Sequence, residues 1–315
     1  SFTPTTPLGD GTYALTATAT DAAGQVGPAS QPIPFTIDTA APAAPTVTSP
    51  GGAVADTTPD ITGTGEAGTT VTLFDGATAV GTATVAQNGT FTVSPATPLT
   101  QGTHSLTVQL TDAAGNVSAA TAPLSVVVDT LPPSAPVITN AGLTNDSTPT
   151  ITGTAEAVTT VTLSNNGTVL GSVVADGNGA FSFTPTQAFG EGANQVTAVA
   201  RDAVGNLGPA SAAVTFTVDT AAPLAPSIAT AGGLTSDDTP TITGRAEAGT
   251  TVTLLNGTTV LGTAIADQNG AFSFTPTIPL GDGTYTLTAT ATDAAGNLGP
   301  ASPPVTLTAA TPARL

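Results

Sequence analysis

Short runs of alternating hydrophobic and polar residues make up most of this chain, and Gly, Pro, Asn or Asp separates one run from the next. Alternation with a period of two residues predicts β-strands that bury one face, and no segment shows sustained helical periodicity. Between Asp38 and Val128 the pattern predicts seven strands, at 46–49, 60–65, 70–73, 79–85, around Phe91 and Val93, around Leu106, Val108 and Leu110, and at 124–128.

Turn sequences between these strands indicate the fold. Gln87-Asn88-Gly89 contains an Asn-Gly pair, which is among the strongest hairpin signals. Short strands rich in Thr and Val, separated by such turns, predict an all-β protein of immunoglobulin-like (Ig-like) β-sandwiches. Phe181 and Phe272 stand where Phe91 stands in the first block, so the predicted core repeats in register.

The whole block recurs along the chain, because Asp-Thr stands at 38–39, 129–130 and 219–220, at spacings of 91 and 90 residues. A fixed period indicates tandem copies of one unit. At ~3.3 Å per strand residue, each unit should be roughly 35–40 Å long and the array an elongated rod on the order of 130 Å. We expect the C-terminal part of a truncated repeat in 1–38, complete Ig-like repeats in 39–129, 130–219 and 220–310, and a tail in 311–315. The sequence would then be a window of a longer array.

Composition narrows the possible functions. The net charge is −18, with no Lys and only three Arg, so nucleic acid and anionic membranes are not expected partners. The chain has no Cys, which excludes disulfides and thiolate chemistry. No apolar run is long enough to insert directly into a membrane, and we expect any export signal to lie outside this window.

Acidic residues recur at fixed places in the block. Following the strands up and down the sandwich places the loops with Glu66 and Asp112 at the end where the linker brings Asp38. These carboxylates should therefore converge at one junction between repeats, although they are far apart in sequence. The equivalent sets are Asp129, Glu156 and Asp202 at the second junction, and Asp219, Glu247 and Asp293 at the third.

Two interpretations of these acids are open. Three carboxylates repel one another without a cation, and calcium accepts irregular cages of oxygen ligands. Zinc and copper are poor candidates for a chain with no Cys and one His. Alternatively, each Asp accepts N–H groups of its own turn and Glu66 is merely solvated. Asp176 and Asp267 stand at the same predicted end and are possible extra calcium ligands, where the first complete repeat has Ala86-Gln87.

Three linked motifs resemble a known family. They are Asp-Thr-Ala-Ala-Pro-Ala-Ala-Pro at 38–45, Thr-Pro-Asp-Ile-Thr-Gly-Thr-Gly-Glu-Ala-Gly at 58–68 and Asp-Ala-Ala-Gly-Asn at 112–116. They resemble the bacterial Ig-like repeats in the stalks of large adhesins and biofilm-associated surface proteins that are exported by type I secretion. In that family calcium between successive domains stiffens the stalk. The resemblance therefore implies that the three acids of each junction are calcium ligands.

Some positions depart from the family pattern. Val158 replaces the Gly found at 68 and 249, and Thr308-Ala309 stands where a further Asp-Thr is expected, so no junction site is expected after the last repeat. The single histidine, His104, occupies the slot of Tyr13 and Tyr285. This slot resembles the tyrosine corner of Ig-like sandwiches, so we expect a structural role rather than catalysis.

The sequence thus predicts a non-enzymatic structural stalk on the bacterial cell surface or outside the cell. Its repeats would contact one another and be made rigid by calcium, in support of adhesion or biofilm formation. Two alternatives remain: a subunit of an extracellular filament or sheath, in which copies of the chain associate in a filament or biofilm matrix, and an accessory module of a secreted enzyme.

Overall fold

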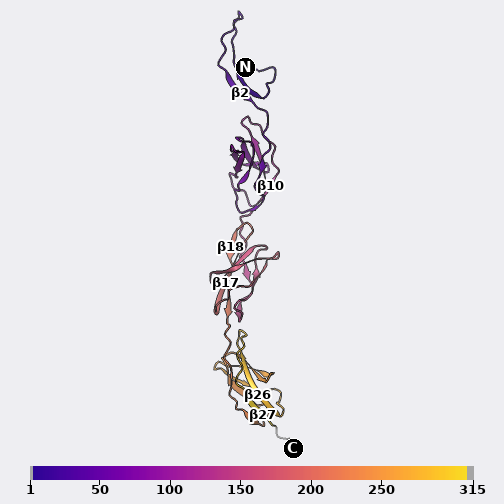
Figure 1. Cartoon of the computed structure of the whole chain (residues 1–315), viewed down its shortest axis with the longest axis vertical. Coiled ribbons are helices and arrows are strands. Elements are labelled where there is room, and N and C mark those ends of the chain that lie inside the picture. Colours follow the sequence, from indigo (N-terminus) through magenta and orange to yellow (C-terminus); the bar gives the residue numbers. More distant parts are fainter. Residues whose placement is uncertain (1–2, 311–315) are drawn as a thin grey trace. The chain divides into compact units, whose positions relative to one another are not determined.

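The computed structural model describes residues 3–310, and the regular secondary structure in that range consists of strands without a helix (Figure 1). The chain divides into two compact units. The first holds the residues up to Leu131 together with 204–206, and the second holds 132–203 and the residues from Leu207 onward.

The first unit begins with an antiparallel pair of strands, β1 (Gly11–Leu15) and β2 (Ile33–Ile37). Tyr13 and Phe35 are Cα partners in this ladder, and their rings stack with centroids 5.6 Å apart. This stacking gives the segment 11–37 a small apolar contact of its own.

One complete sandwich follows in the first unit. Its smaller sheet has the order β3-β5-β8 and its larger sheet the order β4-β10-β9-β6-β7. All ladders are antiparallel except that of β4 with β10, which is parallel. The strands are β3 (Thr46–Val47), β4 (Gly52–Val54), β5 (Ile61–Thr64), β6 (Thr70–Asp75), β7 (Thr78–Thr84), β8 (Thr90–Val93), β9 (Gly102–Thr111) and β10 (Leu124–Val128).

The core of this sandwich follows the alternation of the sequence. In β6 Val71 and Leu73 are buried, and their partners Leu110 and Val108 in β9 are buried opposite them. Phe91 from β8 closes the same cluster from the smaller sheet. Burying alternate residues on facing sheets removes apolar surface from water, which is the main stabilising term of the fold.

The second unit contains two sandwiches with the same topology, each with its own core cluster. The strands of the first are β11 (Val137–Ile138), β12 (Gly142–Thr144), β13 (Ile151–Thr154), β14 (Thr160–Asn165), β15 (Thr168–Val174), β16 (Ala180–Phe183), β17 (Gly192–Arg201), β18 (Leu207–Ala210) and β19 (Val214–Val218). The strands of the second are β20 (Ser227–Ile228), β21 (Gly233–Thr235), β22 (Ile242–Arg245), β23 (Thr251–Asn256), β24 (Thr259–Ile265), β25 (Ala271–Phe274), β26 (Gly283–Thr292) and β27 (Val305–Ala309).

The all-β, tandem Ig-like fold class is confirmed, and each of the seven predicted strands matches an observed one. The sequence did not predict β4, because this strand has three residues and pairs in parallel with the distant β10. The predicted repeat boundaries and the rod length stay predictions. The predicted tail 311–315 lies outside the described residues.

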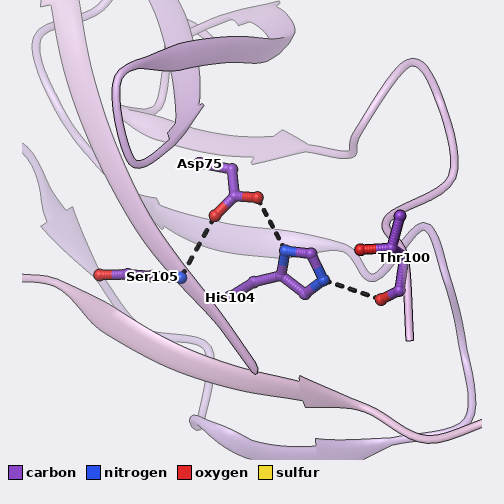
Figure 2. A network of polar contacts seen from close by, with 4 residues as sticks. All are labelled: Asp75, Thr100, His104 and Ser105. Atoms are coloured by element: carbon purple, nitrogen blue, oxygen red, sulfur yellow. Dashed lines mark hydrogen bonds and ion pairs between the residues drawn. The ribbon is translucent and has the colours of Figure 1, made fainter. Parts of the chain in front are cut away.

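The slot of His104 lies at the start of β9 and ties this strand to the preceding loop (Figure 2). His104 Nε2 is 2.8 Å from the carbonyl of Thr100, and Nδ1 is 2.7 Å from Asp75 Oδ2. The equivalent side chains in the other repeats, Tyr13, Asn194 and Tyr285, also bond the carbonyl four residues earlier. This position therefore has the expected structural role whether His, Tyr or Asn occupies it.

Candidate junction site

The Asp-Ala-Ala-Gly-Asn loop after β9 lies where the chain enters the sandwich. Asp112 Oδ1 accepts hydrogen bonds from the N–H groups of Ala114 and Asn116, each at 2.9 Å, and Oδ2 accepts one from Asn116 Nδ2 at 2.9 Å. A carboxylate that accepts N–H groups two and four residues onward fixes the loop as an Asx-type turn.

The charge of this loop is stabilised by its own donors. The hydrogen bond from the Asn116 side chain lowers the pKa of Asp112, the loop N–H groups lower it further, and partial desolvation opposes them. The pKa of Asp293 is lowered in the same way, chiefly by the Asn297 side chain. Both carboxylates are therefore ionised at neutral pH.

The Asn of each loop also bonds the linker that leads into its repeat. Asn116 Nδ2 donates to the main-chain oxygen of Asp38 at 3.0 Å, and Asn297 Nδ2 donates to that of Asp219 at 2.7 Å. Asn206 Nδ2 donates to that of Asp129 at 2.9 Å. The predicted meeting of this loop with the Asp-Thr linker is thus present, but the atoms that meet are an amide and a carbonyl.

A position that sequence reasoning missed holds the Thr of each Asp-Thr pair. Gln101 Oε1 accepts hydrogen bonds from both the N–H and Oγ1 of Thr130, each at 2.9 Å. Asp10 does the same for Thr39, and Glu191 for Thr220. The residues stand at 10, 101, 191 and 282, spacings of 91, 90 and 91, which could have revealed them. Their changing identity, Asp, Gln, Glu and Asp, hid the period.

The carboxylates of the linker Asp residues are used locally. Asp38 Oδ1 accepts the N–H of Ala40 at 3.0 Å, and Asp219 Oδ1 accepts that of Ala221 at 3.1 Å. Asp129 Oδ1 accepts the N–H of Leu131 and the amide of Gln101. These bonds begin the linker as a turn after the last strand.

The loops of the three predicted Glu ligands lie at the entry end of their sandwiches. Gly65 N donates to the carbonyl of Gly89, so the loop of Glu66 adjoins the Asn-Gly turn. The main-chain oxygens of Glu66, Glu156 and Glu247 accept the hydroxyl groups of Thr69, Thr159 and Thr250, and the three Glu residues are exposed.

The possible extra ligands, Asp176 and Asp267, are turn residues of the same kind. Asp176 Oδ1 accepts the N–H groups of Asn178 and Ala180, and Asp267 Oδ1 accepts those of Asn269 and Ala271. Each closes the turn before β16 or β25, and this turn joins the two sheets of the sandwich. The Asn-Gly turns at 88–89, 178–179 and 269–270 are therefore not hairpin turns, because the strands on either side of them do not pair.

The described geometry does not gather the predicted ligands. Within residues 3–310, no three His, Cys, Asp or Glu side chains lie close enough to share a metal ion. Both oxygens of Asp112 and of Asp293 face N–H donors of their own loops. This arrangement matches the turn interpretation of Asp112 and Asp293, and the calcium assignment of the nine junction acids stays a prediction.

The hollow at 44–49 beside 120–124 is open, and small or apolar residues line most of it. His104 is 8% exposed and held on both ring nitrogens, so it is not available as a general base. No helix in the described part of the chain has the length and apolarity to cross a membrane.

The repeats are similar to parts of several known proteins. Exoglucanase B of Cellulomonas fimi is 33% identical over 294 residues, covering 88% of this chain but only 26% of that enzyme. A tetra-tandem repeat from the extending region of a large adhesion protein is 20% identical, covers 96% of this chain and 82% of that chain, and has a TM-score of 0.32. The BSP domain of a biofilm-associated protein is 17% identical, covers 87% and 67%, and has a TM-score of 0.24.

A family model assigns the repeats directly. The bacterial Ig-like domain matches residues 1–39, 47–130, 137–220 and 227–309. Each complete match contains one sandwich with the two-sheet topology described above. Repeats of this family are typically structural and non-catalytic. The chain belongs to the bacterial Ig-like domain family, as a tandem array of its repeats.

Proposed function

We propose that this chain is a spacer: a stalk segment of an extracellular bacterial adhesin, whose repeats hold an adhesive region away from the cell surface. The observation that carries the proposal is that the chain enters and leaves each complete sandwich at opposite ends. A repeat of that kind adds its own length to the array.

The strand register supports this for the last repeat. Its chain enters beside Asn297, whose amide bonds the main-chain oxygen of Asp219. It leaves at Ala309, which pairs with Gly283 at the other end of β26. Because β26 has 10 residues, these ends are about 33 Å apart. The repeat in the first unit is built alike, with Asn116 bonded to Asp38 at entry and Val128 paired with Gly102 at exit.

Composition and surface agree with a spacer outside the cell. A protein without Cys loses nothing in an oxidising environment, and a net charge of −18 keeps the repeats soluble and mutually repulsive. Family membership supports a structural role. Adhesion and biofilm formation enter through the family resemblance.

A second candidate is a spacer within a secreted glucanase, which the 33% identity to part of an exoglucanase favours. The two candidates share the same mechanical role and differ in what is attached. Co-sedimentation of the chain with insoluble cellulose separates a sugar-binding module from a plain spacer. A spacer of either kind stays in the supernatant, whereas an accessory module that binds sugar sediments, so the experiment tests sugar binding and does not tell the two spacers apart.

Small-angle scattering tests the spacer directly. Deleting residues 130–219 should shorten the maximum dimension by roughly 35–40 Å, since one sandwich is lost. Deleting 220–310 should shorten it by the same amount, which makes each deletion the control of the other. An unchanged dimension would contradict the proposal, and sedimentation as a polymer would favour the filament alternative.

Calcium remains part of the proposal as an ion that would add stiffness to the junctions. If calcium binds a junction only when the two neighbouring repeats are in contact, it stabilises that state. The stabilisation grows with the ratio of the free calcium concentration to its dissociation constant. Calorimetric titration of the chain, of Asp129→Ala and of Glu156→Ala tests the ligand assignment. The assignment requires weaker binding in both variants. Binding equal to that of the parent would overturn it.

A further inference from the structure

We propose that the loop Asn at the junctions inside each unit, Asn116 and Asn297, is a latch that holds a repeat at a set angle to the segment before it without a metal ion. This inference deepens the proposed spacer function and rests on it. The latch is the hydrogen bond from Asn Nδ2 to the main-chain oxygen of the linker Asp, seen for Asn116 with Asp38 and for Asn297 with Asp219.

The donor is rigidly mounted on the following sandwich. An amide nitrogen carries two hydrogens, and one hydrogen of Asn297 goes to Asp293 Oδ2 at 2.8 Å. Asp293 also accepts the N–H of Asn297 at 2.9 Å. With its first hydrogen fixed in this way, the amide presents the second to the oxygen of Asp219, 2.7 Å away. Asn116 is oriented by Asp112 in the same manner.

The acceptor is mounted just as firmly on the preceding sandwich. Asp219 N donates to the carbonyl of Thr144 at 2.9 Å, which continues the ladder of β12 with β19 by one residue. The next residue, Thr220, is held by Glu191 through its N–H. The carbonyl between these two anchors therefore has little freedom to turn. A single hydrogen bond then joins two bodies that are each rigid at the contact.

A second feature of the same junction in the second unit is the approach of two loops. A Cβ built on Gly296 would lie 3.5 Å from Asn145 Nδ2, so the entry loop reaches the loop after β12. Ordinary van der Waals spacing is available there. The junction between the repeats of 130–219 and 220–310 therefore has the amide bond of Asn297 and two loops that lie near each other, and neither feature involves a cation.

The first loop of the chain supplies a natural comparison. It reads Asp21-Ala22-Ala23-Gly24-Gln25, with Gln in the place of Asn. Asp21 Oδ1 accepts the N–H groups of Ala23 and Gln25 as in the other loops. The loop fold therefore tolerates Gln, and a longer amide keeps the donor while moving it.

Spin-label distance measurements on the full chain test the latch. The chain has no Cys, so Thr215→Cys and Ser273→Cys, both exposed, place one label on each sandwich of the second unit. In chelator the parent should give a narrow distance distribution. Asn297→Ala and the isosteric Asn297→Asp should broaden it, with the ratio of latched to open forms falling about fivefold, equivalent to ~1 kcal/mol.

Two controls make the result specific. Asn256→Ala removes the side-chain oxygen that accepts the N–H of Thr286 within one sandwich, away from the junction. This variant should leave the distance distribution narrow. Asn297→Gln should restore part of the narrowing, and circular dichroism verifies that every variant is folded. A parent that is broad in chelator and narrow only in calcium would overturn the latch, as would an unchanged Asn297→Ala. The spacer proposal fails separately, if repeat deletion leaves the maximum dimension unchanged.

Discussion

Gln101 holds Thr130 by two hydrogen bonds of 2.9 Å, and its amide donates to Asp129 next to it. One side chain from the loop before β9 thus fixes both residues of the Asp-Thr pair that follows β10. The acids at the same position in other repeats, Asp10 and Glu191, bond only the Thr in this way. Gln101 can donate to the carboxylate of Asp129 because its amide carries N–H groups, which an ionised acid in its place lacks.

Removing this side chain should loosen the start of the linker. In Gln101→Ala the amide of Thr130 loses its acceptor, and its hydrogen exchange should become about fivefold faster, as expected for the loss of one net hydrogen bond. Gln87→Ala, at an exposed turn of the same repeat, should leave that exchange rate unchanged. Equal rates in the parent and Gln101→Ala would show that the side-chain contact does not hold Thr130.

Val158 occupies a backbone conformation that suits glycine. Its φ is +65°, and Gly68 and Gly249 hold +84° and +82° at the same place in the other repeats. A left-handed backbone conformation costs a β-branched residue about 1–2 kcal/mol, and Gly avoids this cost. Gly also loses more conformational entropy on folding, which offsets part of the advantage. Val158→Gly should therefore stabilise its repeat by about 1 kcal/mol in denaturant unfolding.

The reverse change is the matched control. A Cβ on Gly68 meets nothing within 4 Å, so Gly68→Val tests backbone strain without a clash. It should destabilise its repeat by an amount similar to the gain from Val158→Gly. A Gly68→Val variant as stable as the parent would remove the strain argument.

Gly153 allows the smaller sheet to pack closely. A Cβ there would lie 2.3 Å from the carbonyl of Val137 and 2.4 Å from the ring of Phe181, and β11, β13 and β16 would have to separate. Gly153→Ala should destabilise the repeat by about 2–3 kcal/mol through overpacking. Gly177→Ala, in a turn with open space around it, should change stability by less than about 1 kcal/mol in the same unfolding experiment. Similar losses in both variants would contradict this packing role.

The pair of His104 and Asp75 predicts a pH dependence confined to one repeat. The hydrogen bond to Asp75 is the main cause that raises the pKa of His104, and the Thr100 carbonyl raises it further. Because the folded pKa lies above the unfolded value near 6.5, the stabilisation is complete below that value. It is lost as the pH rises through the folded pKa.

Calorimetry at several pH values checks this. The parent should show one transition that moves to lower temperature as the pH rises from about 6 to about 9. His104→Tyr should abolish that movement, since Tyr13 and Tyr285 make the equivalent carbonyl bond without titrating near neutrality. A transition that moves equally in parent and variant would exclude His104 as its cause.

The architecture was accessible from the sequence because it depends on periodicity. Alternation located strands such as β6 and β9, and the spacing of Asp-Thr located the repeats. Parallel pairing of β4 with β10 was not accessible, because three residues carry no periodic signal and their partner lies far along the chain.

The junction was predicted in part. The end of the sandwich where Asp112 meets the linker of Asp38 follows from strand direction alone, and the Asn116 bond agrees with it. The sequence does not show which atoms face each other there, because loop N–H groups and distant groups compete for the carboxylate of Asp112. N–H groups two and four residues away reach Asp112 with little loss of chain entropy, whereas a distant carboxylate must be brought to it.

The parallel ladder beside each last strand has a mechanical consequence. In the second unit, β12 near the start of a repeat pairs with β19 at its end, from Gly142 with Phe216 to Thr144 with Val218. A pull on the two ends of the chain drags these parallel strands lengthwise in opposite directions. Their hydrogen bonds are then loaded in shear and must rupture together instead of unzipping singly. Under tension each repeat should resist until a threshold force and then extend in one step.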